Sequence, residues 1–317
     1  SVSASELRMM AGEVQAEFTA MGCPCKVRLW TADRSLAQDI LHASHQEAVR
    51  FEHKYSRYRQ DSIISLINQA AGQRAVAIDA ETAGIMEYSD ACFVQSDGYF
   101  DITAGKLREI WPINAMSLPT QSDINSCLET VGWDKVKLEK DTIFLTRQGM
   151  ELDLGGVVKE YAADAIAEQA RQAGIDSGYV NLGGDIAIIG PQPDGKPWPI
   201  GISHPQQPEE PIATIQLSKG ALTTSGGYER YVRIEGKKYS HLINPKTGWP
   251  VEGLASVSVA TSKAVIAGSL SSIALLKGEV EGISFLKTCN VPFFAIDQLG
   301  NHHSSRKKLV DTHIKTS

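Results

Sequence analysis

The chain has 317 residues with 42% hydrophobic content, and its 31 Lys and Arg against 37 Asp and Glu give a net charge of −6. This length is enough for one large core or two joined subdomains, and the lack of a basic surplus excludes nucleic acid as the main partner. The longest apolar stretch, residues 257–276, is interrupted by Lys263 and several serines, so no transmembrane segment is predicted. The chain opens at Ser1, and no export signal is visible in it.

The five cysteines do not form a disulfide framework by count or spacing: Cys23, Cys25, Cys92, Cys127 and Cys289. Cys23 and Cys25 are expected on one face of a single strand, an arrangement poorly placed for a disulfide between them. A metal site there would need a second Cys or His pair at ligand spacing, and the sequence offers none. We therefore interpret these two residues as buried, inert thiols.

The first half of the chain predicts a strand pair followed by helices. Residues 14–30 alternate in character around a break at Met21-Gly22, which is typical of two antiparallel strands. Three helices are predicted after it: residues 33–55, a short helix capped by Asp61 that carries Ile63, Ile64 and Ile67, and a helix that runs from an Asp79 cap to Ser96. Tyr58 falls in a connection between helices, where functional residues are common.

The second half of the chain is richer in strands. They are predicted over residues 136–138, 142–145, 200–203, 212–217, 256–260 and 291–296, with a hairpin through Glu235-Gly236 and helices over 264–276 and 282–286. The tail from Asn301 is basic, and we expect it to be loose. The chain is therefore predicted to be a single α+β domain over residues 1–317. It would have a helix-rich part (15–130), a strand-rich part with the ligand site (131–300) and the tail (301–317).

Residues 151–190 read ELDLGGVVKEYAADAIAEQARQAGIDSGYVNLGGDIAIIG. They predict a strand over 152–154, a Gly155-Gly156 turn, a helix and a second strand. The N–H groups of the turn and of the helix start that follows it can receive an anion. Lys159 adds a positive charge at the same end of the helix. A lysine there opposes the helix dipole, and this unfavourable position suggests that the residue has a role in a site. The alternative interpretation is a tight connection with a solvated lysine, because short glycine motifs recur widely.

Four stretches supply groups suited to one kind of ligand. They are Met21-Gly22, the run Tyr99-Phe100-Asp101, residues 155–162 with Lys159, and residues 240–248 with His241. Aromatic faces together with glycine amides suit a flat heterocycle that carries phosphates, such as a dinucleotide. A Rossmann site is not predicted, because no G-x-G-x-x-G follows a strand in a βαβ unit. For Tyr99 and Phe100 the alternative is core packing at a helix end.

The chain resembles the ApbE-type FAD:protein FMN transferases over about residues 15–290. The resemblance rests on seven motifs in fixed order: MGCPCKVRLW, YSRYRQDSIISLIN, SDGYFDITAG, DLGGVVKEYAAD, VNLGGDIAIIG, TTSGGYERY and SHLINPKTGWPV. It implies a two-subdomain α+β fold with mixed and antiparallel sheets and an FAD cleft between the subdomains. It also implies an Mg²⁺-dependent reaction in which a Thr or Ser hydroxyl of a client flavoprotein takes FMN from FAD and AMP leaves. Relatives are often exported or lipid-anchored, so a periplasmic address is expected.

Carried over motif by motif, the resemblance implies that eight residues line the FAD site: Met21, Tyr58, Tyr99, Phe100, Asp101, Lys159, His241 and Leu242. His241 would also be the catalytic group, because an imidazole can accept a proton near neutral pH. The alternative for His241 is a strand-end histidine bonded to the backbone. For Mg²⁺, the resemblance implies the backbone carbonyl of Gly156 and the hydroxyl of Ser272 as ligands.

One position departs from the pattern of the family. The family usually has an Asp at the start of the penultimate helix, and this chain has Gly268 there, with Ser272 four residues later. Mg²⁺ usually takes one or two carboxylates, and glycine has none to offer. Glu160 also stands where many relatives have Gly, next to Lys159, whose charge it would partly neutralise. The sequence therefore leaves two hypotheses: a transferase with an altered metal site, or an FAD-binding protein with weak or no transfer activity.

Overall fold

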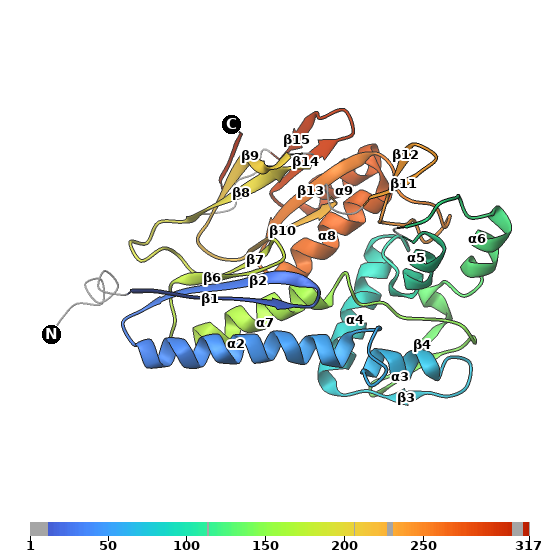
Figure 1. Cartoon of the computed structure of the whole chain (residues 1–317), viewed down its shortest axis with the longest axis horizontal. Coiled ribbons are helices and arrows are strands. Elements are labelled where there is room, and N and C mark those ends of the chain that lie inside the picture. Colours follow the sequence, from blue (N-terminus) through green and yellow to red (C-terminus); the bar gives the residue numbers. More distant parts are fainter. Residues whose placement is uncertain (1–11, 113, 206, 227–230, 306–312, 317) are drawn as a thin grey trace.

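The structure is a computed structural model that describes residues 12–112, 114–205, 207–226, 231–305 and 313–316. An eight-stranded antiparallel sheet forms its centre, in the order β1-β2-β6-β7-β10-β13-β14-β15 (Figure 1). The strands are β1 (Gly12–Ala20), β2 (Cys23–Thr31), β6 (Gly178–Leu182), β7 (Asp185–Gly190), β10 (Ala221–Gly226), β13 (Leu254–Thr261), β14 (Phe293–Asp297) and β15 (His302–Ser304). The sheet thus joins segments from the beginning, middle and end of the chain.

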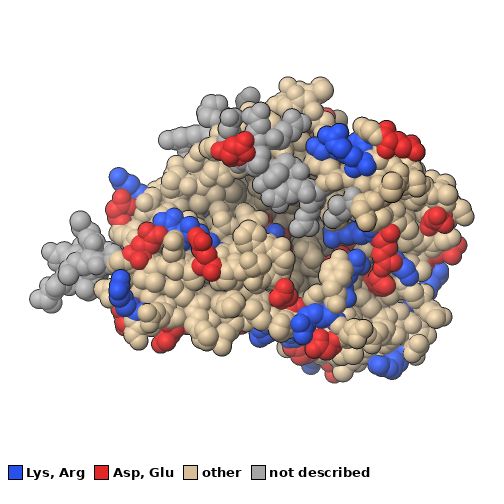
Figure 2. All heavy atoms as spheres, in the orientation of Figure 1, with Lys and Arg blue, Asp and Glu red and all other residues tan. Residues whose placement is uncertain are grey.

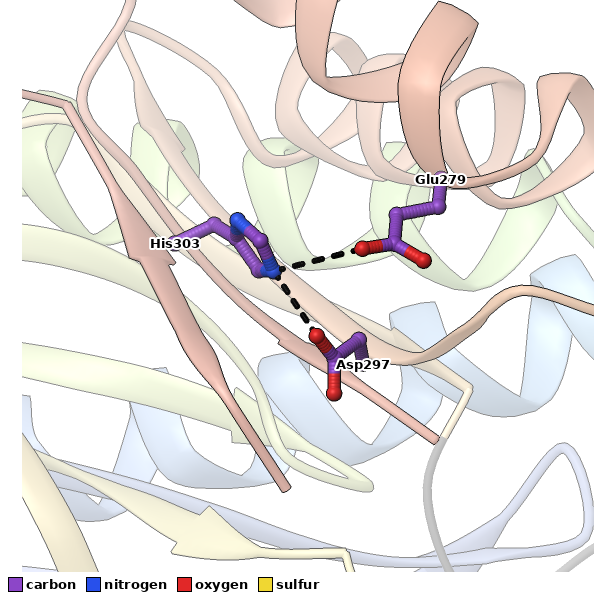
Figure 3. Close-up of side chains that lie close together, drawn as sticks. All are labelled: Glu279, Asp297 and His303. Carbon is purple, nitrogen blue, oxygen red and sulfur yellow. Dashed lines mark hydrogen bonds and ion pairs between the residues drawn. The ribbon is translucent and has the colours of Figure 1, made fainter. Parts of the chain in front are cut away.

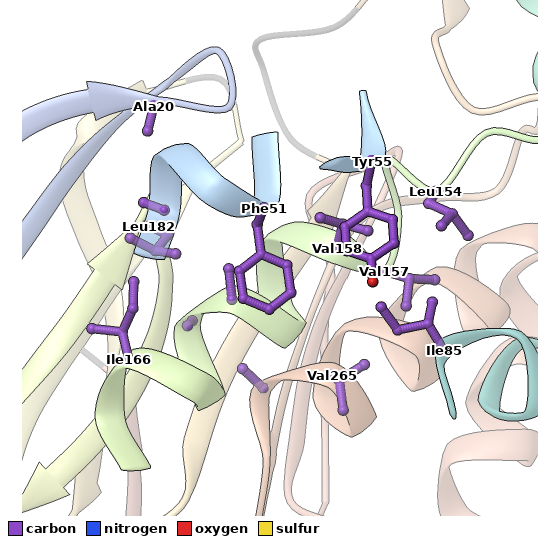
Figure 4. Close-up of a cluster of buried hydrophobic side chains, with 14 of the residues drawn as sticks. Ala20, Phe51, Tyr55, Ile85, Leu154, Val157, Val158, Ile166, Leu182 and Val265 are labelled. Atoms are coloured by element: carbon purple, nitrogen blue, oxygen red, sulfur yellow. The ribbon is translucent and has the colours of Figure 1, made fainter. Parts of the chain in front are cut away.

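Helices cover one face of this sheet, and a smaller sheet covers the other. The helices are α2 (Arg34–Tyr55), α7 (Val158–Gln172), α8 (Ala264–Lys277) and α9 (Glu279–Cys289), and the smaller sheet is β16 (His313–Thr316), β9 (Gln207–Leu217) and β8 (Trp198–His204). Phe51, Ile166 and Val265, from α2, α7 and α8, share one large core (Figure 4). On the opposite face, Ile188 of β7 packs with Trp198 of β8.

The inner strands of the large sheet are buried on both faces, which explains their long apolar runs. In β13, Val257 and Val259 pack with the helices, whereas Ala260 packs with the smaller sheet. In β14, Phe293 faces the helices and its neighbour Phe294 faces the smaller sheet. This alternation follows from the two-residue period of a strand.

A second, mostly helical part lies beside the large sheet (Figure 1). It holds α3 (Ile63–Gln69), α4 (Ala80–Gln95), η1 (Ile102–Lys106), α5 (Leu107–Ile110), α6 (Gln121–Leu128), η2 (Trp133–Lys135), the sheet β3 (Val76–Ala77), β5 (Thr142–Leu145) and β4 (Val136–Leu138), and the hairpin β11 (Tyr231–Ile234) and β12 (Lys237–Ser240). The Trp111 indole donates to the Gly248 carbonyl at 2.8 Å, which fixes the loop after β12 against α5. The predicted boundary near residue 130 stays a prediction.

Most of the predicted elements are confirmed. The first two strands meet at Met21-Gly22, whose positive φ angles of 52° and 70° are those of a two-residue hairpin turn. The long helix and the helix capped by Asp79 are present as α2 and α4. Cys23 and Cys25 are buried and not joined by a disulfide, with their Sγ atoms 3.9 Å apart. Residues 227–230 of the TTSGGYERY motif lie outside the described residues.

Two local predictions are wrong. The cap of α3 is Ser62, whose hydroxyl accepts a hydrogen bond from a backbone N–H of the first turn, and not Asp61. Residues 152–154 do not form a strand. Their backbone instead bonds to other segments, since the Leu152 N–H donates to the Asn68 side chain at 2.7 Å. Both errors have the same cause, because local sequence does not show which partner each backbone group meets.

The tail is not loose where the structure describes it. β15 pairs with β14, and β16 pairs with β9. Asp297 accepts from the N–H groups of Leu299 and Asn301 at 2.9 Å each and lies 3.0 Å from the His303 ring, with Glu279 3.6 Å from the same nitrogen (Figure 3). The bond to His303 lowers the pKa of Asp297 to about 2. This cluster closes the turn between the two strands. Residues 306–312 and 317 of the tail lie outside the described ranges.

Asp164 of α7 caps the start of α8. Its two carboxylate oxygens accept from the backbone N–H groups of Ala264 at 2.7 Å and Val265 at 3.0 Å. The residue at the cap position itself, Lys263, makes no side-chain capping bond. Burial raises the pKa of Asp164, and the two N–H donors act against that rise. The first turn of α8 is therefore held by a side chain from a different helix.

Charged side chains tie α2 to α4. The Glu81 carboxylate accepts from Arg50 at 2.8 Å, Lys54 at 2.9 Å and the Tyr55 hydroxyl at 2.7 Å. Burial alone would raise the pKa of Glu81, but these hydrogen bonds outweigh it and lower the pKa from 4.5 to about 2. Because the pKa is lowered by folding, the stabilisation is present above the ordinary value and is lost as the pH falls towards 2.

Replacing Glu81 by Gln should therefore lower stability at neutral pH and have little effect in acid. We expect a loss of about 1 kcal/mol at pH 7, a figure reduced for partial exposure to solvent, that shrinks below about pH 3. Urea unfolding at the two pH values measures it. Glu87→Gln, on the exposed side of α4, is the matched control. An equal difference between wild type and Glu81→Gln at both pH values would contradict the assignment.

The surface carries charges of both signs. Figure 2 shows acidic and basic side chains interspersed on the viewed face, around a hollow near its middle. Within the described ranges, none of the helices combines the length and the apolar character needed to cross a bilayer.

Candidate functional site

A cavity of about 100 Å³ lies between η1, the start of α7, α8 and the loop after β12. Six of the predicted site residues line it: Tyr99, Phe100, Asp101, Gly156, Leu242 and Ser272. A second cavity of about 400 Å³ shares Tyr99 and Leu276 with the first, so the two adjoin. Its lining includes the rings of Tyr239 and Trp249 and the side chains of Lys237 and Lys277. The site thus combines aromatic faces with positive charge.

Tyr99 stands where the two cavities meet. The ammonium groups of Lys246 and Lys277 lie 4.0 Å and 5.2 Å from the centre of its ring. Phe100, the next residue, is buried and packs in the large core. Tyr99 is therefore placed to contact a ligand, whereas Phe100 has both a lining and a packing role.

Asp101 lines the cavity but also holds local structure. One oxygen accepts from the Thr103 N–H at 2.8 Å and the other from the Trp133 N–H at 3.0 Å. Burial raises the pKa of Asp101, while the bonds from Thr103 and Trp133 oppose the rise. The residue therefore joins η1 to η2 at the cavity wall.

Four predicted residues do not line either cavity as the structure describes them. The Met21 N–H, in the β1–β2 turn, donates to Glu52 at 3.0 Å. Tyr58 is 81% exposed in the connection between α2 and α3. His241 is half-buried and follows β12 directly. The fourth, Lys159, extends from the first turn of α7 towards β7.

Lys159 belongs to a buried cluster with two carboxyl groups. Its Nζ lies 2.9 Å from Oδ2 of Asp185, a residue that is 3% exposed. Burial would lower the pKa of Lys159, but Asp185 and Glu160 raise it above its ordinary value. Burial raises the pKa of Glu160 well above its ordinary range, Asp185 adds to the rise, and Lys159 opposes it. The lysine is thus engaged inside the protein, away from the small cavity.

Glu160 lies against Gly268 of α8. A Cβ at position 268 would be 2.8 Å from Cγ and 3.4 Å from Oε1 of Glu160. This distance is too short for two side chains to coexist without movement. A carboxyl group therefore stands beside α8 at the level of Gly268, and it comes from α7. The sequence contains both residues but does not show that they lie next to each other.

Two charged residues of the small cavity were not predicted as site residues. Arg108 of α5 and Asp153, which precedes the Gly155-Gly156 turn, both line the small cavity with 3.5 Å between their charged groups. Asp153 also accepts from the Gly155 N–H at 2.8 Å and so shapes the turn. Asp153 opens the DLGG motif, and Arg108 follows the SDGYFDITAG motif by three residues. This closeness to the motifs was the signal that could have identified them.

Three oxygen groups suited to a metal ion come from the segment before α7, from the first turn of α7 and from α8. Gly156 precedes α7, and Ser272 lies in α8, where its hydroxyl is 3.2 Å from that of Ser225. A buried oxygen of Glu160, Oε2, has no hydrogen-bond partner among the described residues. A carbonyl, a hydroxyl and a carboxylate are the donor types that a hard divalent cation takes. The residues present therefore fit such an ion.

Most of the chain matches the model of a known protein family. The model of the ApbE family matches residues 21–294. The chain belongs to the ApbE family. Among the relatives of this ApbE-family protein, an FAD:protein FMN transferase of Klebsiella pneumoniae (strain 342) is 31% identical over 245 residues, which cover 75% of this chain and 74% of that protein. One of Haemophilus influenzae is 29% identical over 276 residues, covering 82% and 80%.

Solved structures of ApbE proteins share the fold. The crystal structure of the ApbE protein from Thermotoga maritima gives a TM-score of 0.87 at 27% identity, covering 93% of this chain and 97% of that one. The flavin transferase ApbE from Vibrio cholerae gives 0.83 at 24% identity, covering 93% and 98%. The predicted ApbE-like α+β fold, with antiparallel sheets, is confirmed.

Proposed function

We propose that this protein is an Mg²⁺-dependent FAD:protein FMN transferase. The observation that carries the proposal is the convergence of separate motifs on one cavity. Tyr99, Gly156, Leu242 and Ser272 come from distant parts of the chain and line the same 100 Å³ space. The relatives named FAD:protein FMN transferase support the same activity.

In this proposal the two adjoining cavities take the two halves of FAD. Aromatic rings suit flat ring systems, and Tyr99, Tyr239 and Trp249 supply them. Cationic side chains suit the pyrophosphate, and Arg108 and Lys277 stand at the cavities. The family resemblance implies that Met21, Tyr58, Asp101 and Lys159 also line the FAD site, and this part of the proposal is tested by the flavin affinity of their variants.

The proposed reaction is a phosphoryl transfer. A Thr or Ser hydroxyl oxygen of the client forms a bond to the phosphorus of the FMN half, and the bond from that phosphorus to the bridging oxygen breaks. AMP leaves with the bridging oxygen, and His241 accepts the proton of the hydroxyl. The Gly156 carbonyl and the Ser272 hydroxyl would hold Mg²⁺, which when bound supplies positive charge for the pyrophosphate. A periplasmic address for the protein and its client is part of the proposal, and fractionation of cells tests it.

Flavin titration and mass spectrometry test the function. We expect FAD to bind more tightly than riboflavin, because the cationic groups contact phosphates that riboflavin lacks. With FAD and Mg²⁺, a client flavoprotein should gain the mass of one FMN less water, and a client with its acceptor Thr replaced by Val should not. His241→Asn should bind FAD and transfer slowly.

The alternative function is FAD binding without transfer, and Gly268 is the observation that favours it. Tight FAD binding with an unchanged client mass, at millimolar Mg²⁺, would support this alternative. Equal affinity for FAD and riboflavin would contradict both proposals, since it would remove the phosphate contacts on which they rest.

A further inference from the structure

A buried carboxyl group faces α8 from the first turn of α7. Glu160 is 8% exposed, and its Oε2 atom has no hydrogen-bond partner among the residues that the structure describes. The carboxyl group of Asp185 interacts with that of Glu160, and the one nearby ammonium, that of Lys159, is paired with Asp185 at 2.9 Å. Buried carboxylates are normally paired with a charge or a donor. This oxygen therefore has capacity for a further partner.

The position of Glu160 relates it to the oxygens at the small cavity. Gly156 lies four residues before Glu160, just outside α7, and Ser272 lies one turn after Gly268 within α8. Residues four apart share a face of a helix, so Gly268 and Ser272 lie on one face of α8, and α7 packs against α8. Since a Cβ at position 268 would lie 2.8 Å from Cγ of Glu160, the glutamate fills the space that a side chain at 268 would occupy.

We propose that Glu160 supplies the carboxylate of a divalent-cation site whose other protein ligands are the Gly156 carbonyl and the Ser272 hydroxyl. The acidic ligand then comes from α7 instead of α8, and Gly268 provides the room for it. Glu160 and Gly268, the two positions at which the sequence departs from the expected family pattern, are then explained together. The carboxylate expected on α8 is supplied by α7 instead. The inference rests on the proposed function for the presence of FAD beside the ion.

Binding of Mn²⁺, measured from the electron paramagnetic resonance signal of the free ion with saturating FAD, tests the assignment. Mn²⁺ prefers the same oxygen ligands as Mg²⁺. Glu160→Gln keeps the shape of the side chain and removes its charge, so we expect folded protein whose Mn²⁺ affinity is lower by at least about tenfold. Glu168→Gln, on the exposed side of α7, is the matched control and should bind Mn²⁺ as wild type does.

The exchange itself provides a second test. Gly268→Asp alone places two carboxyl groups in a space for one, and we expect it to lower the thermal midpoint of unfolding. Glu160→Gly alone should lose Mn²⁺ affinity. The double variant Glu160→Gly/Gly268→Asp should regain it to within about threefold of wild type, because the carboxylate returns from the other helix. This pair of variants decides the question if Glu160→Gln does not fold.

Three results would overturn the inference. They are equal Mn²⁺ affinity in wild type and folded Glu160→Gln, equal affinity in Glu160→Gly and the double variant, and no Mn²⁺ binding by FAD-loaded wild type. Failure of the proposed function looks different. A wild-type protein that binds Mn²⁺ through Glu160 but leaves its client unchanged in mass contradicts the transferase and supports the site.

Discussion

Lys159→Met is expected to destabilise the protein by about 3 kcal/mol, because it removes one partner of a buried ion pair and leaves the other uncompensated. The Nζ atom lies 2.9 Å from Asp185, which is 3% exposed. Glu160, a second buried carboxyl group, lies close enough to influence the same charges. The main effect of this substitution should therefore be on folding, although the lysine was predicted to contact the ligand.

A double-mutant cycle separates these two roles of Lys159. Lys159→Met/Asp185→Asn removes both members of the pair, so it should recover most of the stability lost in the single variant. Urea unfolding at pH 7 gives the free energies. Lys26→Met, which breaks an exposed pair with Glu17 at 3.6 Å, should cost less than about 0.5 kcal/mol. A Lys159→Met protein as stable as wild type but poor in FAD binding would instead place the lysine at the pyrophosphate.

Asp164→Ala should cost about 3 kcal/mol, since it removes two hydrogen bonds between a carboxylate and backbone N–H groups and leaves both donors without that acceptor. These donors, on Ala264 and Val265, begin α8, which has no side-chain cap of its own. Loosening this turn should also disturb Ser272 further along the helix. We therefore expect weaker FAD binding in whatever fraction remains folded.

Two further variants check the role of Asp164. Asp164→Asn keeps one carbonyl oxygen as an acceptor, so its stability should fall between wild type and the alanine variant. Gln169→Ala, on the exposed side of α7, should change the free energy of unfolding by less than about 0.5 kcal/mol. If Asp164→Ala unfolds in urea within about 1 kcal/mol of wild type, the cap contributes little and α8 is held by its packing alone.

Much of the fold could be predicted because its signals are local. The helical pattern of residues 33–55 and the Asp79 cap predicted α2 and α4, and Met21-Gly22 predicted the first hairpin. The local sequence could not distinguish Asp61 from Ser62 as the cap of α3, because both residue types cap helices. The cap is the residue whose side chain reaches a free N–H of the first turn, and only the folded structure shows which one does. Leu152 gave a strand-like pattern, but its backbone partner is the side chain of Asn68, far away in the sequence.

The candidate site was predictable in its residue types more than in its geometry. Tyr99, Leu242 and Ser272 were expected in one site, and they line one cavity. Lys159 was predicted at an anion site because it lies at a helix start. Only the folded chain shows that its ammonium group forms an ion pair with Asp185. The contact between Glu160 and Gly268 joins two helices, and one sequence without relatives cannot show such a pair.

The space shared by positions 160 and 268 also restricts how this family can change over evolutionary time. A lineage that moves its acidic residue from one helix to the other by single substitutions must pass through one of two intermediates. One has acids at both positions, crowded and mutually repelling in a volume that admits one side chain. The other has glycine at both and no acid at all. Selection against both intermediates should make the exchange rare, so chains with Glu at 160 and Gly at 268 should form a single branch of the family tree.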